Sequence, residues 1–146
     1  MDELYTSKTT SYLNFASAVY CDRHLYISGG TTDNYNGVKN TVTEFTFKAK
    51  ETTGKLMATS KAFPSMRVTR MRHSMMVARD HLFAFFGYKD KMIFSDTIEF
   101  LNLLSEEPEK EKFLELKIEG YTSYHVEPMI FPAKVCETLD SDYHGN

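Results

Sequence analysis

The feature that most limits the fold of this chain is an internal repeat, in which one order of short strands and turns occurs twice. In the second copy, an apolar run over residues 73–77 leads through the polar turn Arg79-Asp80 into a second apolar run over residues 82–86. A polar loop then leads to a third run over residues 96–101. The first connection is too short for a crossover helix, so this copy predicts an antiparallel meander of strands.

The first copy lies over residues 14–47. It aligns with the second copy when His24 is placed on His81, 57 residues later. The loop that precedes the third strand is two residues shorter in the second copy. The alignment pairs Ser17 with Ser74, Val19 with Met76, Tyr26 with Phe83, Gly30 with Gly87, and Thr43-Glu44-Phe45 with Ile98-Glu99-Phe100. Because repeats of this kind cannot bury their apolar faces alone, we expect them to stack on one another.

The repeated residues resemble the kelch motif, in which the first strand begins near a Ser, the second ends in Gly-Gly and the third carries an acidic–aromatic pair. The residues that carry the resemblance are Ser17, Gly29, Gly30, Glu44 and Phe45 in the first copy and Ser74, Gly87, Glu99 and Phe100 in the second. Residues 63–74 resemble the family's linker between repeats. The chain departs from the motif because Phe86 replaces the first Gly of the second copy and no Trp is present for the fourth strand. We expect Leu56 and Phe113 to take the fourth-strand positions. Leu56–Ala58 starts a short outer strand, which Phe63-Pro64 breaks.

The resemblance implies an all-β fold made of antiparallel four-stranded blades of a kelch-type β-propeller. Residues 1–146 then form one domain, in which repeat one spans about 14–62, repeat two about 63–118, and a partial third repeat or tail 119–146. Propellers contain about four to eight blades, so about two to three blades make an incomplete ring. We expect apolar sheet faces to be exposed at both ends, where further blades of a longer polypeptide or self-association would cover them.

Composition limits the classes of partner. The net charge of −3 gives no overall positive field for nucleic acid or an acidic membrane surface. No apolar run approaches the roughly 18 residues of a membrane span, and residues 1–10 lack the apolar segment of a secretory signal. Cys21 and Cys136 are far apart and form neither a disulfide framework nor a zinc pattern. These observations predict a cytoplasmic protein that binds neither nucleic acid nor membranes.

The sequence lacks recognisable catalytic patterns. Its five histidines show no metal-ligand spacing with one another, with Cys or with a carboxylate. No dinucleotide fingerprint, Walker loop or HExxH motif occurs. We therefore expect no metal, no cofactor and no catalysis. Two alternatives stay open: a propeller-fold enzyme whose catalytic blades lie outside this chain, and a small unrelated β-sandwich or barrel that binds a ligand.

The loops between strands are the expected place for a partner, because kelch proteins usually bind partners at the rim where these loops gather. The candidate residues come from the turn-rich loop 31–40, the linker and the loop 88–95. They are Asp33, Asn34, Tyr35, Arg67, Arg70, Arg72, Tyr88 and Lys89. The three arginines suit an acidic peptide or phosphate, since guanidinium groups donate two hydrogen bonds to one anion. The competing interpretation is that they are solvated loop residues, one of them bonded to the backbone of a blade. The resemblance thus predicts a protein–protein interaction module.

Overall fold

The computed structural model describes residues 13–33, 36–50, 52–90 and 93–120. The expected third repeat or tail lies almost wholly outside the described residues, as do the rim candidates Asn34 and Tyr35. Across the parts that are described, no helix is both long and apolar enough to cross a bilayer.

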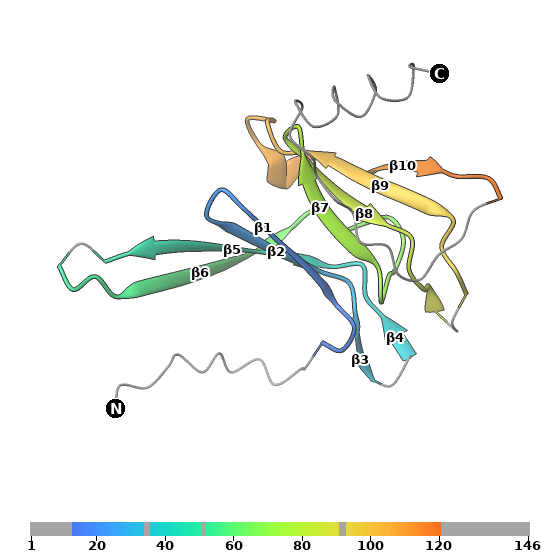
Figure 1. Ribbon diagram of the computed structural model, residues 1–146, viewed down its shortest axis with the longest axis horizontal. Coiled ribbons are helices and arrows are strands. Elements are labelled where there is room, and N and C mark those ends of the chain that lie inside the picture. The colour runs from blue at the N-terminus through green and yellow to red at the C-terminus, as the bar shows by residue number, and fades with distance from the viewer. Residues whose placement is uncertain (1–12, 34–35, 51, 91–92, 121–146) are drawn as a thin grey trace, which may run out of the picture.

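Two four-stranded antiparallel sheets make up most of the described chain (Figure 1). Sheet one, in the spatial order β1-β2-β5-β6, consists of β1 (Ser17–Cys21), β2 (His24–Ser28), β5 (Val42–Ala49) and β6 (Leu56–Phe63). Sheet two, in the order β7-β8-β9-β10, consists of β7 (Ser74–Ala78), β8 (His81–Phe85), β9 (Thr97–Asn102) and β10 (Leu114–Lys117). The prediction of an all-β fold with antiparallel four-stranded sheets is confirmed.

Two connections contain structure of their own. Between β2 and β5, where the sequence predicted a loop, the chain forms the short hairpin of β3 (Thr31–Asp33) and β4 (Asn36–Val38). Between β9 and β10, the charged segment includes one turn of 3-10 helix over Pro108–Lys110. The hairpin lies at one end of the molecule, below the two sheets in Figure 1.

Strand β6 starts and ends where the sequence predicted. The predicted outer strand starts at Leu56–Ala58 and is broken at Phe63-Pro64, and all eight residues of β6 pair with β5, from Leu56 opposite Ala49 to Phe63 opposite Val42. Pro64 follows directly and ends the strand, because a proline has no N–H for the ladder.

Both repeats open with the same hairpin. Asp22 and Arg23 join β1 to β2 with φ values of 46° and 67°, and Arg79 and Asp80 join β7 to β8 with 45° and 61°. Positive φ at both central residues is the type I′ geometry, which matches the twist of the flanking strands. The polar turn predicted for the second repeat is confirmed, and the first repeat has its equivalent.

The Gly-Gly position keeps its backbone conformation in both repeats, although its sequence differs. Gly29 and Phe86 have φ values of 61° and 52°, and Gly30 and Gly87 have 82° and 85°. A Cβ on Gly87 would lie 2.7 Å from the Met71 carbonyl oxygen. The second glycine is therefore required by close backbone approach, whereas Phe86 adopts a left-handed conformation that is unusual for a bulky residue.

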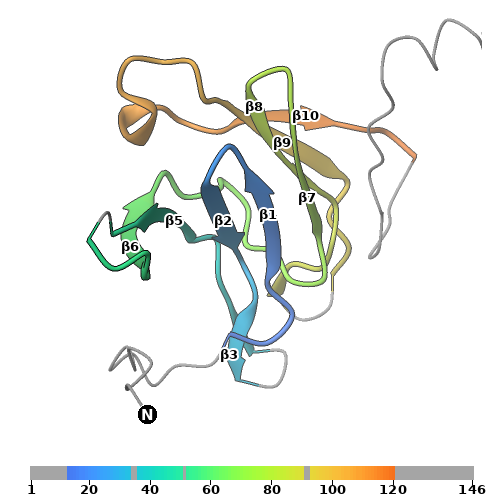
Figure 2. The ribbon, with the colours of Figure 1, turned by 60° about the vertical axis from the view of Figure 1, so that its left-hand side comes forward.

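The core lies between the two sheets. Sheet one contributes Tyr26, Val42 and Phe63, and sheet two contributes Met75, Leu82, Ala84 and Leu101, with Met66 and Phe113 alongside. The first strands of the sheets, β1 and β7, are in contact and lie side by side in both ribbon views (Figure 2). The sheets are thus joined at their first strands, with one face of each turned toward the other.

The register corrects one part of the repeat alignment. Glu44 pairs with Tyr26, whereas Glu99 pairs with Ala84, whose repeat partner is Ile27. Ile27 itself pairs with Thr43. The Glu-Phe pairs of the two repeats are therefore one residue out of step, and a shift of one residue moves a side chain to the other face of its sheet. Matching them by residue type was wrong, because that match ignored the pairing of the strands.

We expect Gly87→Ala to destabilise the protein far more than Gly54→Ala. Gly54 has φ 64° with nothing within 4 Å of an added Cβ, whereas Gly87 has φ 85° and backbone at 2.7 Å. The Gly54 variant should lose about 1–2 kcal/mol from left-handed strain, and the Gly87 variant about 1–3 kcal/mol more from overpacking. Urea unfolding followed by circular dichroism measures both, and equal losses would contradict the close approach.

Candidate functional site

Three of the loop segments predicted to form a rim meet at one end of the molecule. The Gly30 N–H donates to the Arg70 carbonyl at 2.7 Å, and Met71 and Tyr88 exchange two backbone hydrogen bonds of 2.9 Å. The Asp90 carboxylate accepts the Val38 N–H at 3.1 Å. These bonds join the β3–β4 hairpin, the linker and the β8–β9 loop, so the predicted gathering of loops is present.

Aromatic side chains and one arginine dominate this end. The Arg72 guanidinium lies over the Phe15 ring at 4.4 Å, and the rings of Tyr88 and Phe94 are 4.7 Å apart. Phe15 is 38% exposed and Phe94 41%. We call the surface formed by Phe15, Arg72, Tyr88, Lys89, Asp90 and Phe94 the rim surface.

The charges of the rim surface are mixed. Lys89 Nζ lies 3.7 Å from one Asp96 oxygen and Lys117 Nζ 3.6 Å from the other. The pKa of Asp96 is lowered, first by a hydrogen bond from its own backbone N–H and then by Lys117 and Lys89, with burial opposing. Asp90 adds a further carboxylate. The rim surface is therefore an aromatic patch with paired charges, and a basic patch is not assembled here.

The three candidate arginines are separated. Arg72 belongs to the rim surface, whereas the exposed side chain of Arg67 has its Nε 3.9 Å from a carboxylate oxygen of Glu115 on β10. Arg70 is fully buried. The prediction that these arginines act together on an acidic partner is wrong for Arg70, because a buried guanidinium cannot reach a partner.

Arg70 instead forms buried hydrogen bonds that join the linker to β9 and to the two ends of the β8–β9 loop. Its guanidinium donates to Glu99 Oε1 at 2.9 Å and to the backbone carbonyls of Phe86 at 2.6 Å and Thr97 at 3.0 Å. It also donates to the Ser95 and Thr97 hydroxyl groups at 2.9 and 2.6 Å. The competing interpretation, a loop arginine bonded to blade backbone, is confirmed for this residue. Burial lowers the pKa of Arg70, and the Glu99 carboxylate opposes that shift.

The linker that carries Arg70 is bonded to sheet two and to the loop that enters β5 of sheet one. Toward sheet two, Glu99 accepts the backbone N–H groups of Arg67 at 2.5 Å and Val68 at 3.0 Å. Toward the loop that enters β5, the Arg70 N–H donates to Lys39 and the Met66 N–H to Asn40, each at 2.9 Å. Glu99 thus organises the connection between the repeats, and it takes no part in the rim surface.

His73 ties the start of β7 to the end of β2. Its Nε2 lies 2.7 Å from the Ser28 hydroxyl in a buried hydrogen bond. Burial lowers the pKa of His73 to about 3, and the positive charge of Arg70 adds to this shift. His73 is therefore neutral at physiological pH and serves the interface between the sheets.

Glu44 has different neighbours from Glu99. Its Oε1 is 2.5 Å from His24 Nδ1, and its Oε2 is 3.0 Å from Lys61 Nζ. The pKa of Tyr26 is raised to about 12, first by burial of the side chain and then by the negative charge of Glu44. These contacts lie within sheet one and give Glu44 a structural role.

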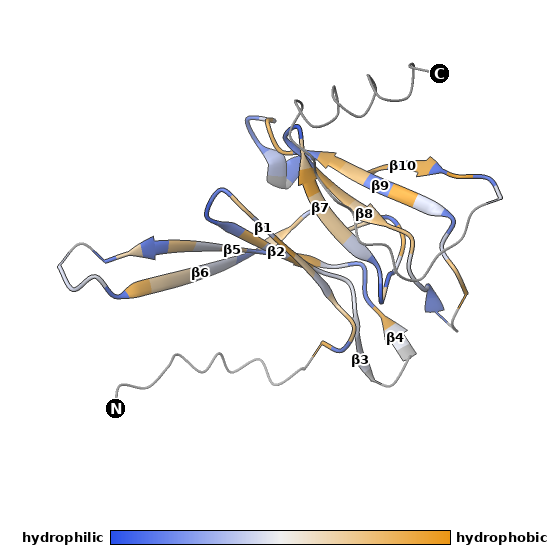
Figure 3. Cartoon of the chain, in the orientation of Figure 1, coloured by the Kyte–Doolittle hydropathy of each residue, from blue (hydrophilic) through white to orange (hydrophobic). Residues whose placement is uncertain are grey.

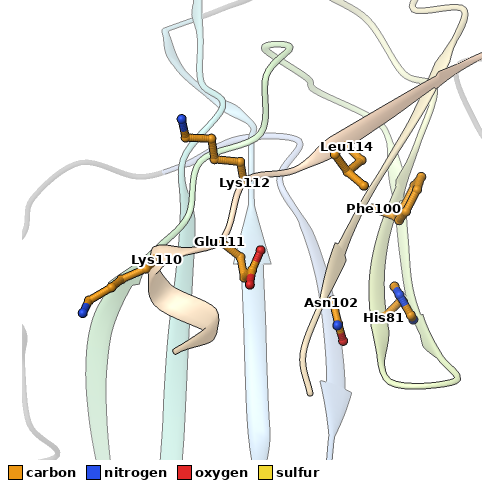
Figure 4. A pocket seen from close by; sticks show the side chains of 7 residues that line it. All are labelled: His81, Phe100, Asn102, Lys110, Glu111, Lys112 and Leu114. Carbon is orange, nitrogen blue, oxygen red and sulfur yellow. The ribbon is translucent and has the colours of Figure 1, made fainter. Parts of the chain in front are cut away.

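A groove of about 530 Å³ lies on sheet two and the connection that leads into β10. It is lined by His81, Phe100, Asn102, Lys110, Glu111, Lys112 and Leu114 (Figure 4). The Lys110 and Lys112 side chains extend away from His81 and Asn102 in this view, and Lys110 Nζ pairs with Glu107 at 2.6 Å. Among the residues that the structure describes, no three His, Cys, Asp or Glu side chains gather as a metal site.

Sequence reasoning named Arg72, Tyr88 and Lys89 of the rim surface, and its candidate loop 88–95 contains Asp90 and Phe94. It missed Phe15, which precedes the first strand, where strand alternation gives no signal. Contact between Phe15 and Arg72 depends on two segments more than 50 residues apart in sequence.

Comparison with known proteins gives a fold and no function. No protein-family model matches the chain, and no curated protein matches it. The solved structure of YjhT is similar, with a TM-score of 0.51 and 11% sequence identity over 77% of this chain. The match covers 40% of YjhT, so the chain spans about two-fifths of that protein's length. The likeness shows a shared arrangement of strands.

We expect Arg70→Met to cost about 3–5 kcal/mol of stability, because it leaves the buried Glu99 carboxylate without its partner. Arg67→Met, on an exposed side chain of the same linker, is the matched control and should change stability by about 0.5 kcal/mol or less. Urea unfolding measures both. Similar midpoints for the two variants would contradict the assigned role of Arg70.

Stability should fall as the pH falls from about 6.5 toward about 3 in part because of His73. The lowered pKa means that the unfolded chain binds a proton in this range while the folded chain does not. The full contribution is present above pH 6.5 and is lost at up to about 1.4 kcal/mol per pH unit below it. His73→Gln should flatten this part of the profile, measured as unfolding free energy at each pH, whereas His81→Gln should preserve it. An unchanged slope in His73→Gln would exclude the effect.

Proposed function

We propose that this chain is a kelch-type β-propeller segment that binds a protein partner through its rim surface and catalyses no reaction of its own. The observation that carries the proposal is the rim surface itself, where the exposed rings of Phe15 and Phe94 and the half-buried side chains of Arg72 and Tyr88 lie on loops that backbone hydrogen bonds hold in place. Tyr and Arg are among the side chains that most often dominate protein–protein binding energy.

The packing order of the sheets supports a propeller-like arrangement over a sandwich. Tyr26 lies on the face of sheet one that packs on sheet two, but its repeat partner Phe83 lies on the opposite, outer face of sheet two. The front of one repeat therefore packs on the back of the next, which is how successive blades stack. The contact between β1 and β7 agrees with blades that join at their first strands.

The chemistry of the rim surface favours a peptide with an apolar side chain beside a carboxylate. The exposed parts of Phe15 and Phe94 offer apolar contact area, and the positive charge of Arg72 beside Phe15 attracts a carboxylate. Lys89 and Asp96 already form a pair, so a phosphate would gain less here. A cytosolic location and the absence of nucleic-acid, membrane and cofactor binding stay predictions from the sequence.

Peptide selection on the immobilised chain tests the proposal. Peptides of twelve random residues would be displayed on phage, selected, synthesised and titrated against variants. We expect Tyr88→Ala and Arg72→Ala to weaken the selected peptides by about 30-fold, the size typical of a dominant contact. Arg67→Ala, in the same linker and off the rim surface, should change affinity less than about twofold. Peptides whose affinity is unchanged by both rim variants would place binding elsewhere and overturn the proposal.

A further inference from the structure

The outer face of sheet two carries an apolar patch that crosses all four strands. Its residues align in the cross-strand rows Met76–Phe83–Phe100–Leu114 and Ser74–Phe85–Ile98–Leu116, and Arg79 and His81 border the patch at the β7–β8 turn. The centre of the Phe83 ring lies 5.9 Å from the ring centre of Phe85 and 5.9 Å from that of Phe100. A groove of about 420 Å³ runs over this face. Figure 3 shows that apolar residues predominate in β7, β8 and β9. Leu114 and Leu116 are 57% and 52% exposed, so none of the residues that the structure describes covers this edge of the patch.

The outer face of sheet one is its counterpart at the other end of the molecule. The rows there are Tyr20–Leu25–Phe45–Ser60 and Ala18–Ile27–Thr43–Ala62, with Phe47 beside Tyr20 at a ring distance of 6.5 Å. Tyr20 is 62% exposed. Like the rows of sheet two, these rows contain no charged residue.

The interface inside the chain shows how two such faces fit. There, the face of sheet one that carries Tyr26 packs on the face of sheet two that carries Leu82 and Ala84. In the alignment of the repeats, which are 57 residues apart, Tyr26 corresponds to Phe83, which lies on the outer face of sheet two. Leu82 and Ala84 correspond to Leu25 and Ile27, which lie on the outer face of sheet one. The two outer faces are thus the repeat equivalents of the two sides of an interface that already exists.

We propose that the outer face of sheet two binds the outer face of sheet one of a second copy of this chain, and that copies close into a ring. This inference rests on the propeller-like order of the proposed function. The contact is heterologous, because different faces meet, and such contacts close when the rotation per copy divides a full turn. A propeller has about four to eight blades, and the described part of each chain forms two four-stranded sheets. With one blade per four-stranded sheet, the ring holds two to four copies.

Light scattering during size-exclusion chromatography gives the mass of the full chain in solution. We expect one species at two, three or four times the 16.9 kDa of the chain, with a mass that does not grow with concentration. A 16.9 kDa monomer at all concentrations, or assemblies that grow without limit, would overturn the closed ring.

Complementing variants test the pairing of the faces. Phe100→Glu should block the outer face of sheet two and Phe45→Glu that of sheet one, so each variant alone should be monomeric. Their mixture should give a dimer with one copy of each, since one intact face of each kind remains. Self-association of either variant would show that like faces pair and would overturn the proposal. Leu104→Glu, at an exposed residue of the β9–β10 connection, should assemble as the wild type does.

Two further substitutions protect the test against misfolding. Leu116→Glu and Tyr20→Glu lie on the same two faces at more exposed positions, and they should reproduce the monomers and the mixed dimer with unchanged circular dichroism. Tyr88→Ala should assemble normally while losing peptide binding. Failure of assembly and failure of the rim surface are therefore observed separately.

Discussion

The buried pair of Arg70 and Glu99 is the interaction on which the arrangement of the two sheets depends. Both side chains are fully excluded from solvent, and a charge in that position is tolerated only when it is paired and hydrogen-bonded. Here the guanidinium has carbonyl, hydroxyl and carboxylate acceptors, and the carboxylate also accepts two backbone N–H groups of the linker. The pair therefore fixes where the chain leaves sheet one and where it enters sheet two.

The path of the linker in turn positions the rim surface. Two residues beyond Arg70, the chain presents Arg72 beside Phe15, and the bridge between Met71 and Tyr88 draws the β8–β9 loop to the same place. A surface made of loops usually loses binding energy to conformational entropy, since mobile side chains must be ordered when a partner binds. Hydrogen bonds from the linker backbone to the buried Glu99 carboxylate hold the linker in place and so reduce that loss.

Much of the fold was predictable because strands leave a local signal. Short apolar runs and a two-residue turn located β7, β8 and β9 to within one residue at each end, and repetition indicated that a similar sheet preceded them. Burial of Arg70 was not predictable by the same means, since its carboxylate partner lies 29 residues away and a linker arginine has the same sequence appearance whether solvated or enclosed. The mismatch of Glu44 with Glu99 has a related cause. The two glutamates were aligned because each precedes a Phe, whereas the pairing of strands decides on which face of the sheet a side chain lies.

The linker also has a consequence for how the molecule unfolds. Its hydrogen bonds run to Asn40 and Lys39 on one side and to Glu99 on the other, and His73 reaches Ser28 across the same boundary. Opening either sheet alone would expose these buried groups without partners, which carries a large desolvation cost. The two repeats therefore behave as a single cooperative unit, and slowly exchanging amide protons should be lost from both sheets together.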